Sequence, residues 1–134
     1  MGRTVFERII AGELPCARVY EDELVYAFMD AGQINPGHVL VVSRRPYETL
    51  LDADDATAGA LFVAARRIAR AVEQAFRPAG ITILQANRPA AGQTVPHLHL
   101  HVLPRHENDG VALTWPRKNP PLEELQALAR RIVI

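Results

Sequence analysis

Residues 92–103 read GQTVPHLHLHVL and contain three of the chain's five histidines. His97, His99 and His101 alternate with leucines, and successive side chains of a strand point to opposite faces of a sheet. The alternation therefore predicts a strand over residues 95–104, with the imidazoles on one face and the leucines in a core on the other. Imidazole is a nucleophile, a general base and a metal ligand near neutral pH, so the same stretch predicts a site.

The rest of the chain predicts an α+β fold. Hydrophobic spacing and turn residues indicate a largely antiparallel five-stranded sheet with one long helix and short terminal helices. The helices are expected over residues 4–11, from 52–55 to about 76, and from 121 onward. The other strands are expected over residues 17–20, 25–29, 38–43 and 81–85.

Composition favours one domain over residues 1–134 that binds neither nucleic acid nor membrane. The chain is 49% hydrophobic and 22% charged, and its formal net charge is zero, which gives no broad attraction to polyanions. No segment approaches the roughly 20 apolar residues of a membrane span, and the first residues lack the apolar run of a signal peptide. Cys16 is the sole cysteine, so no internal disulfide is possible. We therefore expect a cytoplasmic protein.

Three interpretations of the histidines compete. Neighbouring imidazoles could share a zinc ion, but same-face residues of a strand stand about 7 Å apart, and the local sequence offers no Asp, Glu or Cys before Glu107. Alternatively, one imidazole attacks a phosphorus atom while its neighbours orient it and manage protons. The small residues of 90–94, AAGQT, support this interpretation because they let backbone N–H groups approach an anion. The third interpretation is a polar, solvated sheet face.

Several motifs together resemble the histidine-triad (HIT) family of nucleotide hydrolases and transferases. Residues 97–103 match the family's His-x-His-x-His-x-x signature, in which x is hydrophobic, and residues 91–95 match the loop before it. IIAGELP at 9–15, FMD at 28–30 and PGHVLV at 36–41 match as well. The resemblance covers about residues 3–105 and leaves 106–134 as a C-terminal extension.

The resemblance implies catalytic roles for four histidines. His99 matches the residue that attacks the α-phosphorus of a nucleotide and forms a covalent nucleotidyl-histidine, which water then hydrolyses. His97 is expected to hold the second ring nitrogen of His99 through its main-chain carbonyl, which keeps the attacking imidazole neutral and oriented. His101 matches the residue that contacts phosphate and helps to protonate the leaving group. His38 matches the fourth histidine of the site.

The resemblance also implies a nucleotide-binding pocket. Asp30 matches the acid that holds the ribose hydroxyls, and Gln93 and Thr94 match positions that bind phosphate and the leaving group. The backbone N–H of Val95 should add an anion contact. The apolar walls around the base match Phe6, Ile9 and Phe28, although each of these could equally be plain core.

One departure from the family concerns metal. Many members carry a structural zinc ion held by a Cys-x-x-Cys pair, a later histidine and a histidine of the triad region. Thr4, Glu7 and Pro46 stand at the first three of those positions here. All three ligands are absent together, so we expect no metal and no cofactor.

Other departures lie around the expected pocket. Ala86 stands where Asn or Gln is usual, and Asn87 is expected to restore that contact through a small shift. Arg88 and Pro89 follow where glycine is common, which narrows the loop or adds a phosphate contact. Ala31 replaces a larger aliphatic residue and leaves one wall of the base site open.

The main hypothesis is a nucleotide hydrolase or nucleotidyl transferase for AMP or GMP conjugates such as phosphoramidates, adenylylated amines or dinucleoside polyphosphates. The alternatives are a catalytically weak nucleotide-binding module and a metal-binding protein. Leu98 argues against the uridylyltransferase branch, which has proline there, and the Trp115-Pro116 pair resembles the tail of Hint-like members. The resemblance implies a homodimer. If a neutral imidazole attacks, activity should decline below pH of about 6.5.

Overall fold

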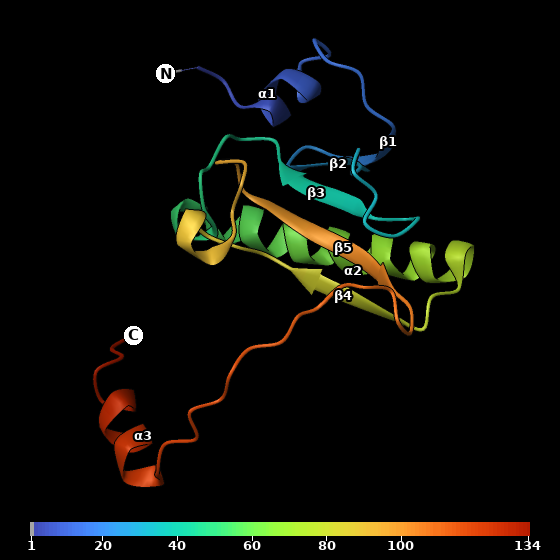
Figure 1. Cartoon of the computed structure of the whole chain (residues 1–134). Helices are drawn as coiled ribbons and strands as arrows, with labels where there is room; N and C mark the ends of the chain where they lie inside the picture. Colours follow the sequence, from blue (N-terminus) through green and yellow to red (C-terminus); the bar gives the residue numbers. More distant parts are fainter. Residues whose placement is uncertain (1) are drawn as a thin grey trace.

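The computed structural model describes residues 2–134 and has an α+β fold built on one antiparallel sheet (Figure 1). The strands stand in the order β1-β2-β3-β5-β4, and every neighbouring pair is antiparallel. The expected fold class, with five strands, one long helix and short terminal helices, is confirmed. The elements are α1 (Val5–Ile10), β1 (Arg18–Glu21), β2 (Val25–Met29), β3 (Val39–Ser43), the 3-10 turn η1 (Leu50–Asp52), α2 (Asp55–Phe76), β4 (Gly80–Leu84), the 3-10 turn η2 (Pro89–Ala91), β5 (His99–Arg105) and α3 (Leu122–Ala129).

The sheet carries an apolar layer on each face, with α2 on one side and α1 on the other (Figure 1). Helix α2 begins after Asp54, whose carboxylate caps it by accepting a hydrogen bond from the N–H of Thr57. Its buried side chains recur at helical spacing, so one stripe packs on the sheet and forms the main core. These side chains are Thr57, Leu61, Ala64, Ala65, Ile68 and Val72.

The register of β5 decides which face the histidines occupy. Val42 in β3 pairs with His99, and Leu40 pairs with His101. Residues directly opposite each other in an antiparallel pair share a face. Leu40 and Val42 belong to the smaller apolar cluster on the α1 side, so both imidazoles lie on that side. Leu100, between them, belongs to the core under α2.

The predicted start of the histidine strand is wrong. The sequence pattern predicts a strand over residues 95–104, whereas β5 begins at His99. Pro96 has no N–H to give to a neighbouring strand, and the N–H of His97 bonds back to the carbonyl of Val95 at 2.8 Å in a tight turn. His97 therefore precedes the strand, and other contacts must hold its ring.

The C-terminal segment leads away from the sheet (Figure 1). Helix α3 begins directly after Pro121, as expected, but its apolar side chains are all exposed. They are Leu122, Leu125, Leu128 and, just beyond the helix, Ile132. Within residues 2–134, no helix combines the length and the apolar character needed to cross a membrane.

Candidate active site

His99 is held in the tautomer that a nucleophile needs. Its Nδ1 lies 2.6 Å from the main-chain oxygen of His97. A carbonyl oxygen only accepts, so the proton of the neutral ring sits on Nδ1 and the lone pair on Nε2. Burial lowers the pKa of His99, against the opposing effects of its bond to His97 and of the Asp30 carboxylate. The ring therefore keeps an oriented lone pair, which is the form that attacks an electrophile.

His97 is fixed at both ring nitrogens. Its Nε2–H donates to the main-chain oxygen of Ser43 at 2.6 Å, which leaves Nδ1 to accept from the hydroxyl of Thr4 at 2.8 Å. The side chain is 0% exposed, and burial lowers the pKa of His97, with the Ser43 hydrogen bond opposing. The carbonyl that orients His99 thus belongs to a residue anchored to β3 and to the start of α1.

His38 and His101 form a second pair beside His99. His38 Nε2 lies 2.9 Å from His101 Nδ1 and 3.5 Å from Asp30 Oδ2. The N–H of Ile34 donates to His38 Nδ1 at 3.4 Å, which assigns the His38 proton to Nε2. His38 then donates to His101, and the His101 proton sits on Nε2. The His101 ring, which then carries a free N–H donor, lies beside the His99 ring, with 5.1 Å between the ring centroids.

The four imidazoles are neutral near pH 7. Burial lowers the pKa of His38, with Asp30 opposing. The effect is larger for His101, because burial and repulsion from His99 and His38 together lower its pKa to about 4. A charged imidazole in this cluster would lose its hydration and be repelled by its neighbours. The rings therefore become protonated only at a pH below the ordinary histidine pKa of about 6.5.

The predicted walls of the base site lie on the same sheet face. Phe6 in α1 is buried and stands edge-on to His99, with 5.0 Å between ring centroids, and to Phe28, with 5.5 Å. Ile9 packs against the same cluster. The structure therefore brings Phe6, Phe28 and Ile9 together beside the histidines. Their contact with a base stays a prediction.

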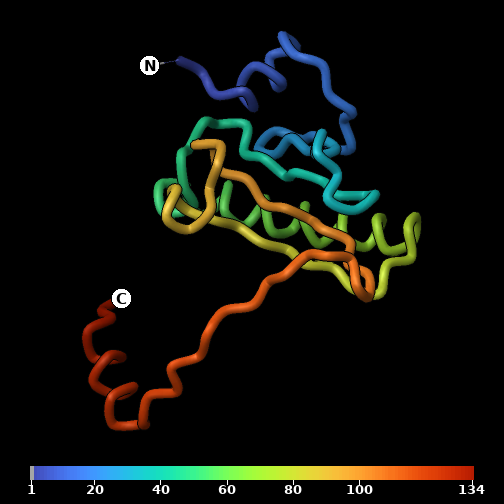
Figure 2. Tube along the Cα trace, in the orientation of Figure 1, coloured from blue at the N-terminus to red at the C-terminus, as the bar shows by residue number. Residues whose placement is uncertain are grey.

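Gln93 braces the loop before the triad. The buried side chain accepts a hydrogen bond from the N–H of Arg88 at 2.6 Å, and its amide donates to the main-chain oxygen of Glu48 at 2.7 Å. The first bond closes the loop on itself, and the second joins it to the segment after β3, which Figure 2 shows at its side. The phosphate contact predicted for Gln93 would therefore have to use the side-chain N–H that these bonds leave free.

The other residues of this loop that were predicted to contact the nucleotide have other surroundings. The side-chain oxygen of Asn87 accepts from the N–H of Leu50 at 2.8 Å, and its amide pairs with that of Gln85. Thr94 is exposed, and Val95 packs against the cluster that contains Phe6. Nucleotide contacts of Asn87, Thr94 and Val95 stay predictions.

Three of the site residues also have the spacing of metal ligands. Asp30, His38 and His101 each offer one ligand atom, and these atoms lie within 4.8 Å of one another. His97 is not part of this set, and both of its ring nitrogens are already hydrogen-bonded. The hydrogen bond between His38 and His101 accounts for their proximity without a cation, and the expectation of a metal-free site stays a prediction.

Sequence patterns miss two residues that support the site. Thr4 accepts from the N–H of Glu7 at 3.1 Å, and Glu7 accepts from the N–H of Thr4 at 2.9 Å, which forms a capping box at the start of α1. The Thr-x-x-Glu spacing signals that helix start, but nothing local signals the second bond of Thr4, to His97. Ser43 has no signal either, because it contributes a backbone carbonyl.

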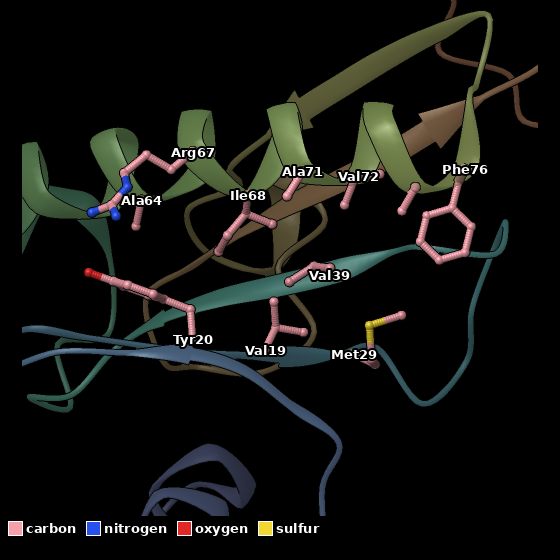
Figure 3. Close-up of a pocket in the computed structure, with 11 residues that line it drawn as sticks. Val19, Tyr20, Met29, Val39, Ala64, Arg67, Ile68, Ala71, Val72 and Phe76 are labelled. Atoms are coloured by element: carbon pink, nitrogen blue, oxygen red, sulfur yellow. The ribbon is translucent and has the colours of Figure 1, made fainter.

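An apolar groove lies on the other side of the sheet from the histidines (Figure 3). It measures about 400 Å³ and runs between α2 and strands β1 to β3. Phe76 and Met29 lie at one end, and Arg67 stands over the ring of Tyr20 at the other. None of the four site histidines lines this groove, so the candidate chemistry lies on the α1 side.

The fold and the site define an α+β protein with a cluster of neutral histidines, three buried and one half-buried, on one side of the sheet. The HIT domain family model matches residues 11–108, and the chain belongs to the HIT family. It is 42% identical over 112 residues to protein hit of Bacillus subtilis, which covers 83% of this chain and 77% of that protein. A crystal structure of a HIT family member from Bacillus subtilis matches over 99% of both chains, with a TM-score of 0.90 and 37% identity.

A relative with a named activity matches over most of the chain. The adenosine 5'-monophosphoramidase of Schizosaccharomyces pombe is 28% identical over 129 residues, which cover 96% of this chain and 94% of that protein. The family model and the two Bacillus subtilis matches confirm, at the level of the family, the resemblance drawn from the sequence motifs.

Proposed function

We propose that the chain hydrolyses purine nucleotide conjugates, or transfers their nucleotidyl group, by attack of His99 on the α-phosphorus. The observation that carries the proposal is the 2.6 Å bond from His99 Nδ1 to the carbonyl of His97, which leaves Nε2 as a free lone pair. Phosphoramidates, adenylylated amines and dinucleoside polyphosphates share the same reacting phosphorus. The phosphoramidase relative makes an amide of AMP the first substrate to test.

The proposed reaction has two displacements. In the first, a bond forms between His99 Nε2 and phosphorus, and the bond from phosphorus to the leaving amine breaks. The amine keeps that electron pair and takes a proton from solvent. The positive charge that develops on His99 is stabilised by its Nδ1–H bond to the carbonyl of His97. Water then attacks phosphorus and loses a proton to solvent, while the bond from phosphorus to His99 Nε2 breaks and its electron pair returns to the ring. This step releases the nucleoside monophosphate and neutral His99.

His101 acts in this scheme as a hydrogen-bond donor. Its pKa of about 4 keeps the free ring neutral, and a neutral imidazole is too weak an acid to give up its last proton. Its Nε2–H, fixed by the bond from His38, instead donates to phosphate or to the leaving atom. His101 assists departure of the leaving group without being charged beforehand.

Replacement of His99 tests the proposal. His99→Ala should lower kcat for an AMP amide by at least about 1,000-fold, because a missing nucleophile removes the covalent route, while the far-UV circular dichroism stays unchanged. His106→Ala is the matched control, since His106 is an exposed histidine outside the cluster. Wild-type turnover by His99→Ala would defeat the assignment.

A catalytically weak nucleotide-binding module is the second candidate. It is favoured by the internal bonds of Gln93 and Asn87, which engage side chains expected to hold the substrate. Calorimetry that detects AMP binding, together with no turnover of any conjugate, would select this function. Elemental analysis of protein purified without a histidine tag would detect the remaining alternative, a metal-binding protein.

We also propose that each chain is a single domain, with a core over about residues 3–105 and an extension over 106–134. Two copies of this chain then form a homodimer. Two surfaces support the pairing: β4 is an edge strand with Ile83 41% exposed, and the apolar side of α3 is uncovered. Light scattering coupled to size-exclusion chromatography measures the mass. A purely monomeric mass would overturn the dimer. Residence in the cytoplasm stays a prediction.

A further inference from the structure

We infer that Thr4 is a positioning residue for the reaction: its hydroxyl, by donating to His97 Nδ1, holds in place the carbonyl that orients His99. The inference rests on the proposed role of His99 as the nucleophile. It assigns to the start of α1, remote in sequence from the triad, a part in setting the tautomer of the attacking ring.

The direction of each hydrogen bond follows from its partners. Ser43 contributes a carbonyl oxygen, so His97 Nε2 must carry the proton and the neutral ring offers only a lone pair at Nδ1. The Thr4 oxygen accepts the N–H of Glu7 and keeps its own proton free, which it gives to His97 Nδ1 across 2.8 Å. One hydroxyl therefore caps α1 and fixes the buried ring at once.

His97 depends on such contacts more than its neighbours do. It precedes β5, and its N–H is spent on the local turn to Val95, so its main-chain N–H makes no bond to a neighbouring strand. Its side chain is 0% exposed, and a buried acceptor without a donor is costly. Without the Thr4 hydroxyl, the ring is driven to shift, and its carbonyl shifts with it.

Helix α1 transmits the same constraint by packing. Phe6 stands edge-on to His97, with 5.7 Å between ring centroids, and to His99, with 5.0 Å. Thr4 lies two residues before Phe6, at the N-cap of the helix. The bond from Thr4 to His97 thus locks the helix against the two rings that its phenylalanine contacts.

Three variants separate positioning from helix capping. Thr4→Val keeps the shape of the side chain but removes both the cap and the donor. Thr4→Ser keeps both. Glu7→Ala removes the other half of the capping box and leaves the Thr4 hydroxyl in place.

The expected result is a loss of kcat without a loss of substrate binding. In Thr4→Val, kcat for the AMP amide should fall about 10-fold, the size expected for one hydrogen bond to an oriented group. KM should stay within about twofold of wild type.

The conservative variant and the control complete that test. Thr4→Ser should restore kcat to within about twofold of wild type, and Glu7→Ala should stay within about threefold. Wild-type kcat in Thr4→Val, or an equal loss in Glu7→Ala, would overturn the inference, because either result makes the hydroxyl's bond to His97 irrelevant to turnover.

Nitrogen-15 NMR of the imidazole rings gives a readout that needs no turnover. Wild type should show His97 as the Nε2–H tautomer and His99 as the Nδ1–H tautomer, with slow solvent exchange of the His99 proton. In Thr4→Val that proton should exchange faster. Unchanged exchange would refute the positioning role even if the wild-type protein proved to have no hydrolase activity, so the two proposals fail separately.

Thr4→Asp provides an independent variant that keeps the helix cap. A carboxylate accepts the N–H of Glu7 as well as a hydroxyl does, but it cannot donate to His97 Nδ1. His97 should then take up a proton and show both ring nitrogens protonated near pH 7. Persistence of the neutral Nε2–H tautomer in this variant would contradict the contact between the side chain at position 4 and His97 Nδ1, and a wild-type ring protonated on Nδ1 would contradict the proposed direction of the bond.

Discussion

His38 Nε2 donates to His101 Nδ1 across 2.9 Å, and this one bond fixes the protons of two rings in the cluster. Because the N–H of Ile34 occupies the other nitrogen of His38, the pair has a single neutral arrangement. It leaves the Nε2–H of His101 free to donate to a ligand bound beside His99. The site is thus prepared as a set of neutral donors and acceptors rather than as a cluster of cations.

This arrangement revises the pH dependence expected from sequence. Lowered pKa values of His99 and His101 keep the neutral rings populated below pH 6.5, so kcat/KM should stay flat from pH 8 to below 6.5 and fall only at lower pH. Rates corrected for spontaneous hydrolysis of the substrate check this. An acid limb centred at 6.5 or higher would argue against buried, neutral histidines.

Stability should follow the same protonation. The unfolded chain has histidine pKa values of about 6.5, while folded His101 has a pKa of about 4. Between these values the unfolded state binds more protons, so the free energy of unfolding decreases as pH falls from about 6.5 to 4. His101→Gln should flatten this decrease in urea unfolding series. An identical pH slope in wild type and variant would show that His101 is not responsible.

The turn before β3 requires glycine on two grounds. Gly37 has φ of +100°, and an added Cβ would stand 2.7 Å from Cδ2 of Phe76. Gly37→Ala should therefore cost about 2 kcal/mol of unfolding free energy. Gly59→Ala is the matched control, because Gly59 lies inside α2 with open space around it and should gain about 0.5–1 kcal/mol. Equal effects in chemical denaturation would contradict the account.

Arg88 adopts a backbone conformation that suits glycine. Its φ is +75°, and the next residue is Pro89. A positive φ of this size raises the energy of any residue that carries a Cβ. Arg88→Gly should therefore be more stable than Arg88→Ala by about 1 kcal/mol, although glycine usually destabilises a chain. Thermal unfolding of the two variants measures the difference, and a more stable alanine variant would remove the argument for strain.

Local patterns predicted what local geometry controls. The alternation of His99, Leu100 and His101 placed imidazoles and leucines on opposite faces correctly, because a strand alternates whatever surrounds it. The start of the strand was predicted wrongly, because the turn from Val95 to His97 depends on where pairing with β3 ceases. Periodicity over a few residues does not contain that information.

Local sequence patterns did not predict the hydrogen bonds between distant residues. Thr4 bonds to His97 across 93 positions. The zinc site of other family members joins these two regions, but no pattern in this chain predicts a direct bond between them. Gln93 and Asn87 were expected to face the substrate from their place in the motif, but their bonds to Glu48 and Leu50 arise from how two loops meet at one end of the sheet. Such partners are set by the closed fold, and only the structure reveals them.

The most direct test of the account is the mass of the protein during turnover. Wild-type protein mixed with an AMP amide, quenched in base and mapped by peptide mass spectrometry, should carry one nucleotidyl group on His99 that appears and decays with product formation. His106→Ala should carry it too, and His99→Ala should not. A nucleotidyl group on any other residue, or full turnover with none on His99, would contradict the central claim.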